Sequence, residues 1–136
     1  MATVASFEEL VVWQDARQLV KVVYAETQRR PWARDYRFCS QIQSAATSTM
    51  SNIAEGFERG TKQEFIHFLN IAKGSNGELR LLLHVALDQT YLGEDRFKEL
   101  QESALALSRR LACFIKYLEG FQGKSRLRKA EAKSNV

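Results

Sequence analysis

Basic and aromatic side chains alternate in one short stretch of this sequence, between residues 29 and 37. Arginine binds phosphate groups through several N–H donors, and aromatic rings stack on nucleic-acid bases. The stretch therefore indicates a surface for RNA or DNA, and Asp35 is its only acid. The alternative is that Trp32 and Tyr36 close one end of a helical bundle while the arginines lie in solvent. The candidate contacts are Arg29, Arg30, Arg34 and Arg37.

A second group of basic residues lies at the end of the chain. Residues 123–136 hold five cations and one acid, and so account for the whole formal net charge of +4. Such a segment suits polyanions, although basic chain ends also occur simply for solubility. We expect a frayed or disordered basic tail here, with Lys124, Arg126, Arg128 and Lys129 as candidate nucleic-acid contacts.

Charged and amide side chains surround the short segment near Gly60. Asn52, Glu55 and Arg59 are spaced to share one side of a helix, and Glu64 follows in the next helix. Residues three or four positions apart on a helix can form ion pairs and hydrogen bonds. We therefore predict a structural network that holds the turn between two helices, rather than a catalytic group.

The sequence gives little support for metal or enzyme chemistry. Glu64 and His67 have the Glu-x-x-His spacing of ferritin-like di-iron sites. Such a site needs a second pair and further carboxylates, but the other histidine, His84, has no glutamate three positions earlier. Cys39 and Cys113 lack CxxC spacing and are interpreted as small core residues. We predict no catalytic residue, no cofactor and a non-enzymatic role.

The elements that position these residues are predicted to be helices. One proline and seven glycines in 136 residues favour long helices over strands and turns. The breaks at Pro31, Gly60, Gly93 and Gly120 divide the chain into an all-α, up-down antiparallel four-helix bundle over residues 1–122. Ser6 and Glu9 have the spacing of a capping box at the first helix start. The predicted helices cover residues 7–27, 38–59, 61–92 and 94–119.

The third predicted helix is longer and more apolar than a monomeric bundle requires. Its second half carries one apolar side for the core and another that contains Leu81 and Val85. Gly74 and Gly77 each cost about 1 kcal/mol relative to alanine in a helix, so close approach of another helix, with residues 44–48 as partner, is expected. A helix break or a ligand-contacting bulge is the alternative. We predict a homo-oligomer with Leu81 and Val85 at its interface.

The amino-terminal residues and the hydropathy predict a cytoplasmic protein. Residues 1–9 lack the basic and apolar regions of a signal peptide. No stretch approaches the roughly 18 apolar residues of a membrane span. We expect a cytoplasmic protein without a membrane partner.

Several short motifs occur together in an order that resembles the four-helix-bundle family of 23S ribosomal RNA intervening-sequence proteins. The resemblance covers about residues 7–118 and implies an up-down bundle that assembles into pentameric rings. The related accessory variability determinant proteins of diversity-generating retroelements bind nucleic acid and a reverse transcriptase. The motifs are Phe7-x-x-Leu10-x-x-Trp13, Gln41-Ile42-x-x-Ala45-Ala46, Asn52-Ile53-Ala54-Glu55-Gly56, Glu64-Phe65-x-x-Phe68-Leu69 and Gly74-Ser75-x-x-Glu78-Leu79.

Charge and resemblance together lead to two functional hypotheses. The first is a non-enzymatic, homo-oligomeric adaptor that presents basic surfaces to RNA or DNA. The second is a protein-interaction scaffold without nucleic-acid binding. A strong salt dependence of nucleic-acid affinity would favour the first.

Overall fold

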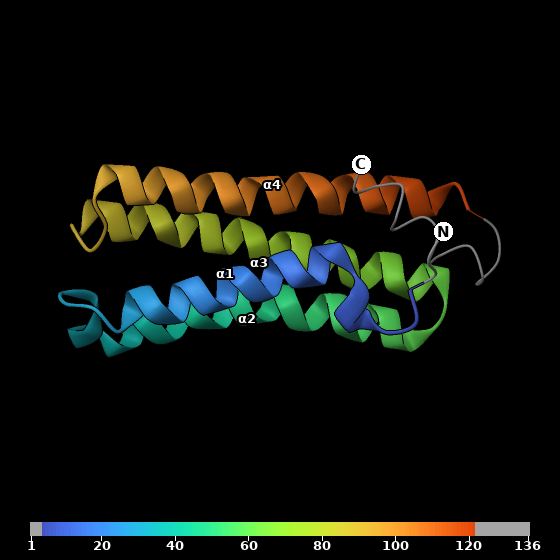
Figure 1. Cartoon of the computed structure of the whole chain (residues 1–136), viewed down its shortest axis with the longest axis horizontal. Helices are drawn as coiled ribbons and strands as arrows, with labels where there is room; N and C mark the ends of the chain where they lie inside the picture. Colours follow the sequence, from blue (N-terminus) through green and yellow to red (C-terminus); the bar gives the residue numbers. More distant parts are fainter. Residues whose placement is uncertain (1–3, 122–136) are drawn as a thin grey trace.

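The computed structural model describes residues 4–121, which form a bundle of four long helices. The helices are α1 (Val11–Thr27), α2 (Tyr36–Arg59), α3 (Lys62–Asp88) and α4 (Glu94–Glu119), with short 3-10 turns η1 (Phe7–Glu9) and η2 (Trp32–Arg34). Successive helices run in opposite directions (Figure 1). The predicted all-α four-helix fold is confirmed, and the described residues contain no strand. Assembly into a ring stays a prediction.

The helices are arranged in two layers of two. In Figure 1, α1 and α2 form the lower layer, and α3 and α4 form the upper one. The closest packing is between α2 and α3, while α1 and α4 contact each other least of the neighbouring helices. The bundle is therefore tightly closed along α2 and α3 and more open along α1 and α4.

Aliphatic and aromatic side chains from all four helices fill the centre. Ile42 and Leu69 are fully buried, and so are Leu111 and Phe114. Each such side chain contributes roughly 1.5–3 kcal/mol by leaving water, so this core supplies the main stabilising free energy. The buried Asn76 donates from Nδ2 to the Ala104 carbonyl oxygen at 2.9 Å, which joins α3 to α4.

The first helix begins at Val11 rather than at residue 7. Leu10 is extended, with φ −70° and ψ 128°, and separates η1 from α1. Its side chain is only 1% exposed, so burial of Leu10 accounts for the interruption. The predicted capping box is also different, because the Glu9 carboxylate accepts from the Ala5 N–H at 3.2 Å.

The third helix ends at Asp88 rather than at residue 92. The N–H of Tyr91 donates to the Ala86 carbonyl oxygen at 2.8 Å, and Thr90 has a φ of 61°, so the chain turns before Tyr91. With 27 residues, α3 is close to α4 with 26 and α2 with 24. The third helix therefore has no excess length that only another chain could cover.

Glycine permits close helix packing at one place that the sequence did not indicate. A Cβ on Gly56 would lie 2.7 Å from the Cβ of Phe68, so α2 and α3 lie close together there. A Cβ on Gly74 would meet nothing within 4 Å, and one on Gly77 would meet only Arg80. The prediction that Gly74 and Gly77 permit close approach of another helix of this chain is therefore wrong. The predicted partner segment does contact α3 nearby, where Ser48 and Ser75 share a hydrogen bond of 2.9 Å.

Candidate nucleic-acid interface

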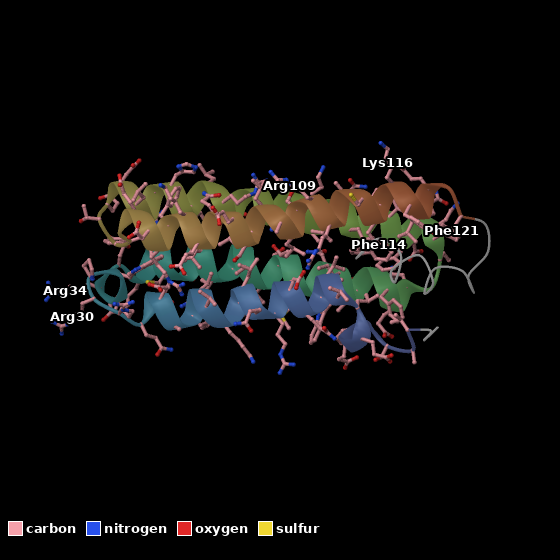
Figure 2. The ribbon with its side chains drawn as sticks, turned by 45° about the horizontal axis from the view of Figure 1, so that its top comes forward. Arg30, Arg34, Arg109, Phe114, Lys116 and Phe121 are labelled. Carbon is pink, nitrogen blue, oxygen red and sulfur yellow. The ribbon has the colours of Figure 1, made fainter. Side chains whose placement is uncertain are left out.

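The α1–α2 connection gathers exposed arginines at one end of the bundle. Arg29, Arg30, Arg34 and Arg37 are all exposed there. Figure 2 shows that Arg30 and Arg34 extend away from the end of the helices. Within residues 4–121, the side chains of Arg30, Arg34 and Arg37 form no ion pair or hydrogen bond. Their guanidinium groups keep their donors for an external partner.

The two aromatic residues of this connection have different roles. Trp32 is 1% exposed, and its ring lies 5.8 Å from that of Tyr91 and 6.1 Å from that of Phe38. It closes the end of the bundle, as the alternative interpretation predicted, and cannot stack on a base. Tyr36 is 82% exposed, so its predicted role as a plug is wrong. Tyr36 is therefore the aromatic ring of this connection that a base could reach.

Asp35, the single acid of the connection, is held by two hydrogen bonds. Its carboxylate accepts from the Phe38 N–H at 3.1 Å, which caps α2, and from the Tyr91 hydroxyl at 2.6 Å. The bond from Tyr91 is the main cause that lowers the pKa of Asp35, and the same bond raises the pKa of Tyr91. Asp35 therefore positions the α1–α2 connection against the α3–α4 connection.

A buried carboxylate lies next to these arginines. Glu26 is 6% exposed at the end of α1, and its carboxylate accepts from Arg96 Nε at 2.7 Å. Arg29 Nη1 lies 3.7 Å from the same carboxylate. The hydrogen bond to Glu26 is the largest cause that raises the pKa of Arg96. This pair joins the end of α1 to the start of α4 and leaves Arg29 mostly free.

The residues predicted around the hinge form a smaller network than expected. Arg59 Nη2 donates to Glu55 at 3.2 Å, and Arg59 Nη1 lies 3.8 Å from Glu64. Thr61 caps α3 by accepting from the Glu64 N–H at 3.2 Å. Asn52 lies outside this network, because its Nδ2 donates to the Ser48 carbonyl oxygen at 2.8 Å. The network joins α2 to α3 and has a structural role.

The other predicted site residues are not brought to the arginine-rich end. Leu81 on α3 is 60% exposed, while Val85 is half-buried against the core. Cys113 is exposed, so its predicted place in the core is wrong, whereas Cys39 is buried. The candidate tail contacts Lys124, Arg126, Arg128 and Lys129 lie outside the described residues.

The described part of the chain contains neither a metal-binding cluster nor a membrane-spanning helix. No group of three or more His, Cys, Asp and Glu side chains among residues 4–121 could hold a metal ion. None of its helices combines the length and the apolar character that crossing a membrane requires.

A groove of about 370 Å³ lies between α1 and α4, where the bundle is most open. Its floor is apolar and includes Leu19, Leu100 and Leu107. Asp15 on α1 pairs with Arg110 on α4 beside it. The groove lies along the helices, separate from the α1–α2 connection, and its apolar floor suits a protein side chain better than a phosphate.

The sequence matches a known family over most of the bundle. The model of the 23S rRNA-intervening sequence protein family matches residues 8–113. The chain belongs to this family. The match to the 23S rRNA-intervening sequence proteins covers most of α1 to α4 and agrees with the resemblance found from the motifs. No curated protein matches the chain.

A crystal structure shows the same fold in another protein. It is a protein with unknown function from the S23 ribosomal protein family of Bacteroides thetaiotaomicron, 20% identical in sequence. The two structures superpose with a TM-score of 0.71, over 78% of this chain and 99% of the other. At this identity the likeness extends to the fold alone. Membership of the 23S rRNA-intervening sequence protein family thus establishes the fold but not the function.

Several contacts of the arginine-rich end were missed from the sequence. The pairs Asp35 with Tyr91 and Glu26 with Arg96 join residues that are far apart in the chain. The sequence separation of these residues does not predict the pairs, because the pairing depends on which helix ends meet in space. Asp35 did carry a local signal, because aspartate just before a helix is a favoured N-cap.

Proposed function

We propose that this chain is a non-enzymatic, homo-oligomeric adaptor that binds RNA or DNA through the arginine-rich end of its bundle. The observation that carries the proposal is the set of three exposed arginines without a partner in the described chain: Arg30, Arg34 and Arg37. Cations that are not paired internally can neutralise phosphates at little cost in broken contacts. Binding is therefore expected to depend strongly on salt and weakly on base sequence.

Tyr36 adds a second type of contact to this surface. It lies between Arg34 and Arg37 in sequence and is 82% exposed, so an unpaired base can stack on its ring. Base stacking on an aromatic side chain contributes roughly 1–3 kcal/mol and tolerates any base. This favours single-stranded segments over a continuous duplex.

Self-association is part of the proposal, and the outer side of α3 supports it. Ile71 is 39% exposed and Leu81 is 60% exposed on this helix. Gly74, three positions after Ile71, leaves open space above the helix, which permits another helix to approach closely. A second copy would bury these side chains. Several arginine-rich ends in one assembly would then increase the avidity for a long nucleic acid.

The alternative function is a protein-interaction scaffold, and the α1–α4 groove favours it. The groove has an apolar floor of leucines and a polar edge, as protein-binding surfaces do. Replacing Ser103 and Ala106, which line the groove, by arginine would block it. Stoichiometric capture of a protein that is lost in this variant, with no nucleic-acid binding, would support the scaffold.

The proposal is tested by equilibrium binding of structured RNA and duplex DNA across a salt series. The full chain is compared with a chain ending at Gly123 and with a variant in which Arg29, Arg30, Arg34 and Arg37 become glutamine. A control variant removes the same charge elsewhere. In it, glutamine replaces four residues that are exposed on α3 and α4: Lys73, Lys98, Arg109 and Lys116. Light scattering checks that all four proteins assemble alike.

We expect the loop variant to bind at least tenfold more weakly and the control variant to be much less affected. The slope of log affinity against log salt should become shallower by about 0.7–0.9 for each phosphate that the variant no longer neutralises. Weaker binding confined to the chain ending at Gly123 would move the binding surface to the tail. Affinity at non-specific levels that no variant changes would contradict nucleic-acid binding and favour the scaffold.

A further inference from the structure

A small polar hollow lies at the arginine-rich end, between the α1–α2 and α3–α4 connections. Its volume is about 160 Å³, below the roughly 300–1,000 Å³ of pockets for drug-sized ligands. The hollow suits one small ionic group better than a base or a whole nucleotide. The residues that line it are Glu26, Arg29, Arg30, Trp32, Tyr91, Leu92, Gly93 and Arg96.

The lining carries more positive than negative charge. Three arginines line the hollow against one carboxylate, which gives its lining a net charge of +2. Arg96 uses Nε for Glu26 and its Nη1 lies 3.7 Å from Glu99, so its Nη2 retains N–H donors. Arg29 Nη1 lies 3.7 Å from Glu26, and the other nitrogens of Arg29 also retain donors. A terminal phosphate monoester carries a charge of about −1.5 to −2 at pH 7, which matches this lining, whereas an internal phosphodiester carries only one charge.

A buried donor in the lining also lacks an acceptor. Trp32 lines the hollow and is 1% exposed, and its indole N–H makes no hydrogen bond within residues 4–121. Buried indole N–H groups usually find a partner. An oxyanion in the hollow would place an acceptor next to Trp32.

We propose that this hollow binds the terminal phosphate of a nucleic-acid strand, with Arg29, Arg30 and Arg96 as the groups that hold it. This inference rests on the proposed function and makes it specific for strand ends. Glu26 holds Arg96 in place rather than contacting the strand. Phosphate binding here involves no bond breaking.

The first test compares oligonucleotides of one sequence with a 5′-phosphate, a 3′-phosphate or no terminal phosphate. The full chain should bind at least one phosphorylated strand about tenfold more tightly than the unphosphorylated one, because charge-assisted hydrogen bonds to the extra phosphate are strong. The double variant Arg29→Gln and Arg30→Gln should lose this preference. The control Arg34→Gln and Arg37→Gln removes the same charge, and should weaken binding of all three strands while keeping the preference.

The second test observes the hollow directly with inorganic phosphate as the probe. The two tryptophans each give one indole N–H signal in a ¹H–¹⁵N spectrum, and Trp13→Phe assigns them. The Trp32 signal should shift on addition of phosphate, and chloride at equal ionic strength should not shift it. The double variant Arg29→Gln and Arg30→Gln should give a weaker shift, and its circular dichroism confirms that it is folded.

The outcomes separate this inference from the function on which it rests. Equal affinity for all three oligonucleotides, with salt-dependent binding intact, would overturn the terminal-phosphate site and leave the adaptor standing. A Trp32 signal that does not shift when phosphate is added would also contradict the phosphate site. If no oligonucleotide binds but the Trp32 signal shifts, the adaptor fails and a phosphate site remains.

Discussion

The two ends of the bundle use similar residues in opposite ways. At the hinge end, Arg59 pairs with Glu55 and Glu64, and its guanidinium also lies 5.1 Å from the ring of Phe68. At the other end, Arg34 and Arg37 have no such partners among the described residues, and Arg34 extends away from the helices (Figure 2). The hinge end therefore uses its cation to hold two helices together, while the arginine-rich end keeps its cations available.

The aromatic residues differ between the two ends in the same way. At the hinge end, Phe57 and Phe65 pack edge to face, with centroids 5.9 Å apart. At the arginine-rich end, Trp32 and Tyr91 close the core, but Tyr36 is 82% exposed. A charged or aromatic residue is thus informative about binding only after its internal contacts are known.

The largest effect on stability is expected at the tight contact of the hinge end. Gly56→Val should lower the free energy of unfolding by roughly 2–3 kcal/mol, because its Cβ would lie 2.7 Å from that of Phe68. Denaturant unfolding measures the change. Gly120→Val is the matched control, since a Cβ there would meet only the Tyr117 carbonyl oxygen, at an ordinary contact distance of 3.6 Å. Equal destabilisation by both would contradict the tight packing at Gly56.

The next effect concerns the buried carboxylate of the arginine-rich end. Arg96→Met should lower the free energy of unfolding by roughly 1–2 kcal/mol, because Glu26 loses its 2.7 Å hydrogen bond. The loss is limited because Arg29 still lies 3.7 Å from Glu26. Chemical unfolding of this variant and of Glu26→Gln, alone and combined, gives the coupling between the two residues. Additive effects would show that the pair does not join α1 to α4.

The pH dependence of stability distinguishes the two ends further. The Tyr91 hydroxyl lowers the pKa of Asp35 below its ordinary value of 3.8, so folding favours the ionised carboxylate. Stability from this bond is complete above that ordinary value and is lost as the pH falls through the lowered pKa. Tyr91→Phe should therefore make stability less sensitive to acid as the pH falls below the ordinary pKa of 3.8, as measured by unfolding at several pH values. An unchanged profile would contradict the role of this bond.

The smallest effect is expected from the exposed ion pairs of the hinge. Arg59→Gln should change stability by less than about 1 kcal/mol, because Arg59 and Glu55 are both about half exposed. Thermal unfolding at low and high salt measures this change. A decrease well above that value would mean that the hinge network is more than a weak surface contact.

The sequence predicted the fold much better than the contacts at either end. Apolar spacing and the breaks at Pro31, Gly60 and Gly93 were local signals, and they placed the helices within a few residues. The extended backbone of Leu10 and the turn before Tyr91 were missed, since both depend on what buries those side chains. Helix ends follow tertiary contacts that local patterns do not contain.

Only part of the candidate site was predicted, because the rest also depends on tertiary contacts. The exposed arginines were found because their clustering is visible in the sequence. The different roles of Trp32 and Tyr36 were not, because the two rings differ only in which one meets Tyr91 and Phe38 in space. The use of Gly56 rather than Gly74 for close packing likewise required the structure.

The most direct measurement compares RNA binding by two triple variants from which equal charge has been removed. One carries Arg30→Gln, Arg34→Gln and Arg37→Gln at the arginine-rich end. The other carries Arg59→Gln, Lys62→Gln and Lys116→Gln at or near the hinge end. Affinity for one single-stranded RNA is measured for both and for the unchanged chain across a salt series.

We predict that the first variant binds at least tenfold more weakly and that its slope of log affinity against log salt falls by about 2, as expected when roughly three phosphates of a single strand are no longer neutralised. The second variant should keep both the slope and most of the affinity. An equal decrease in the two variants would contradict the claim that unpaired arginines at one end of the bundle form the binding surface.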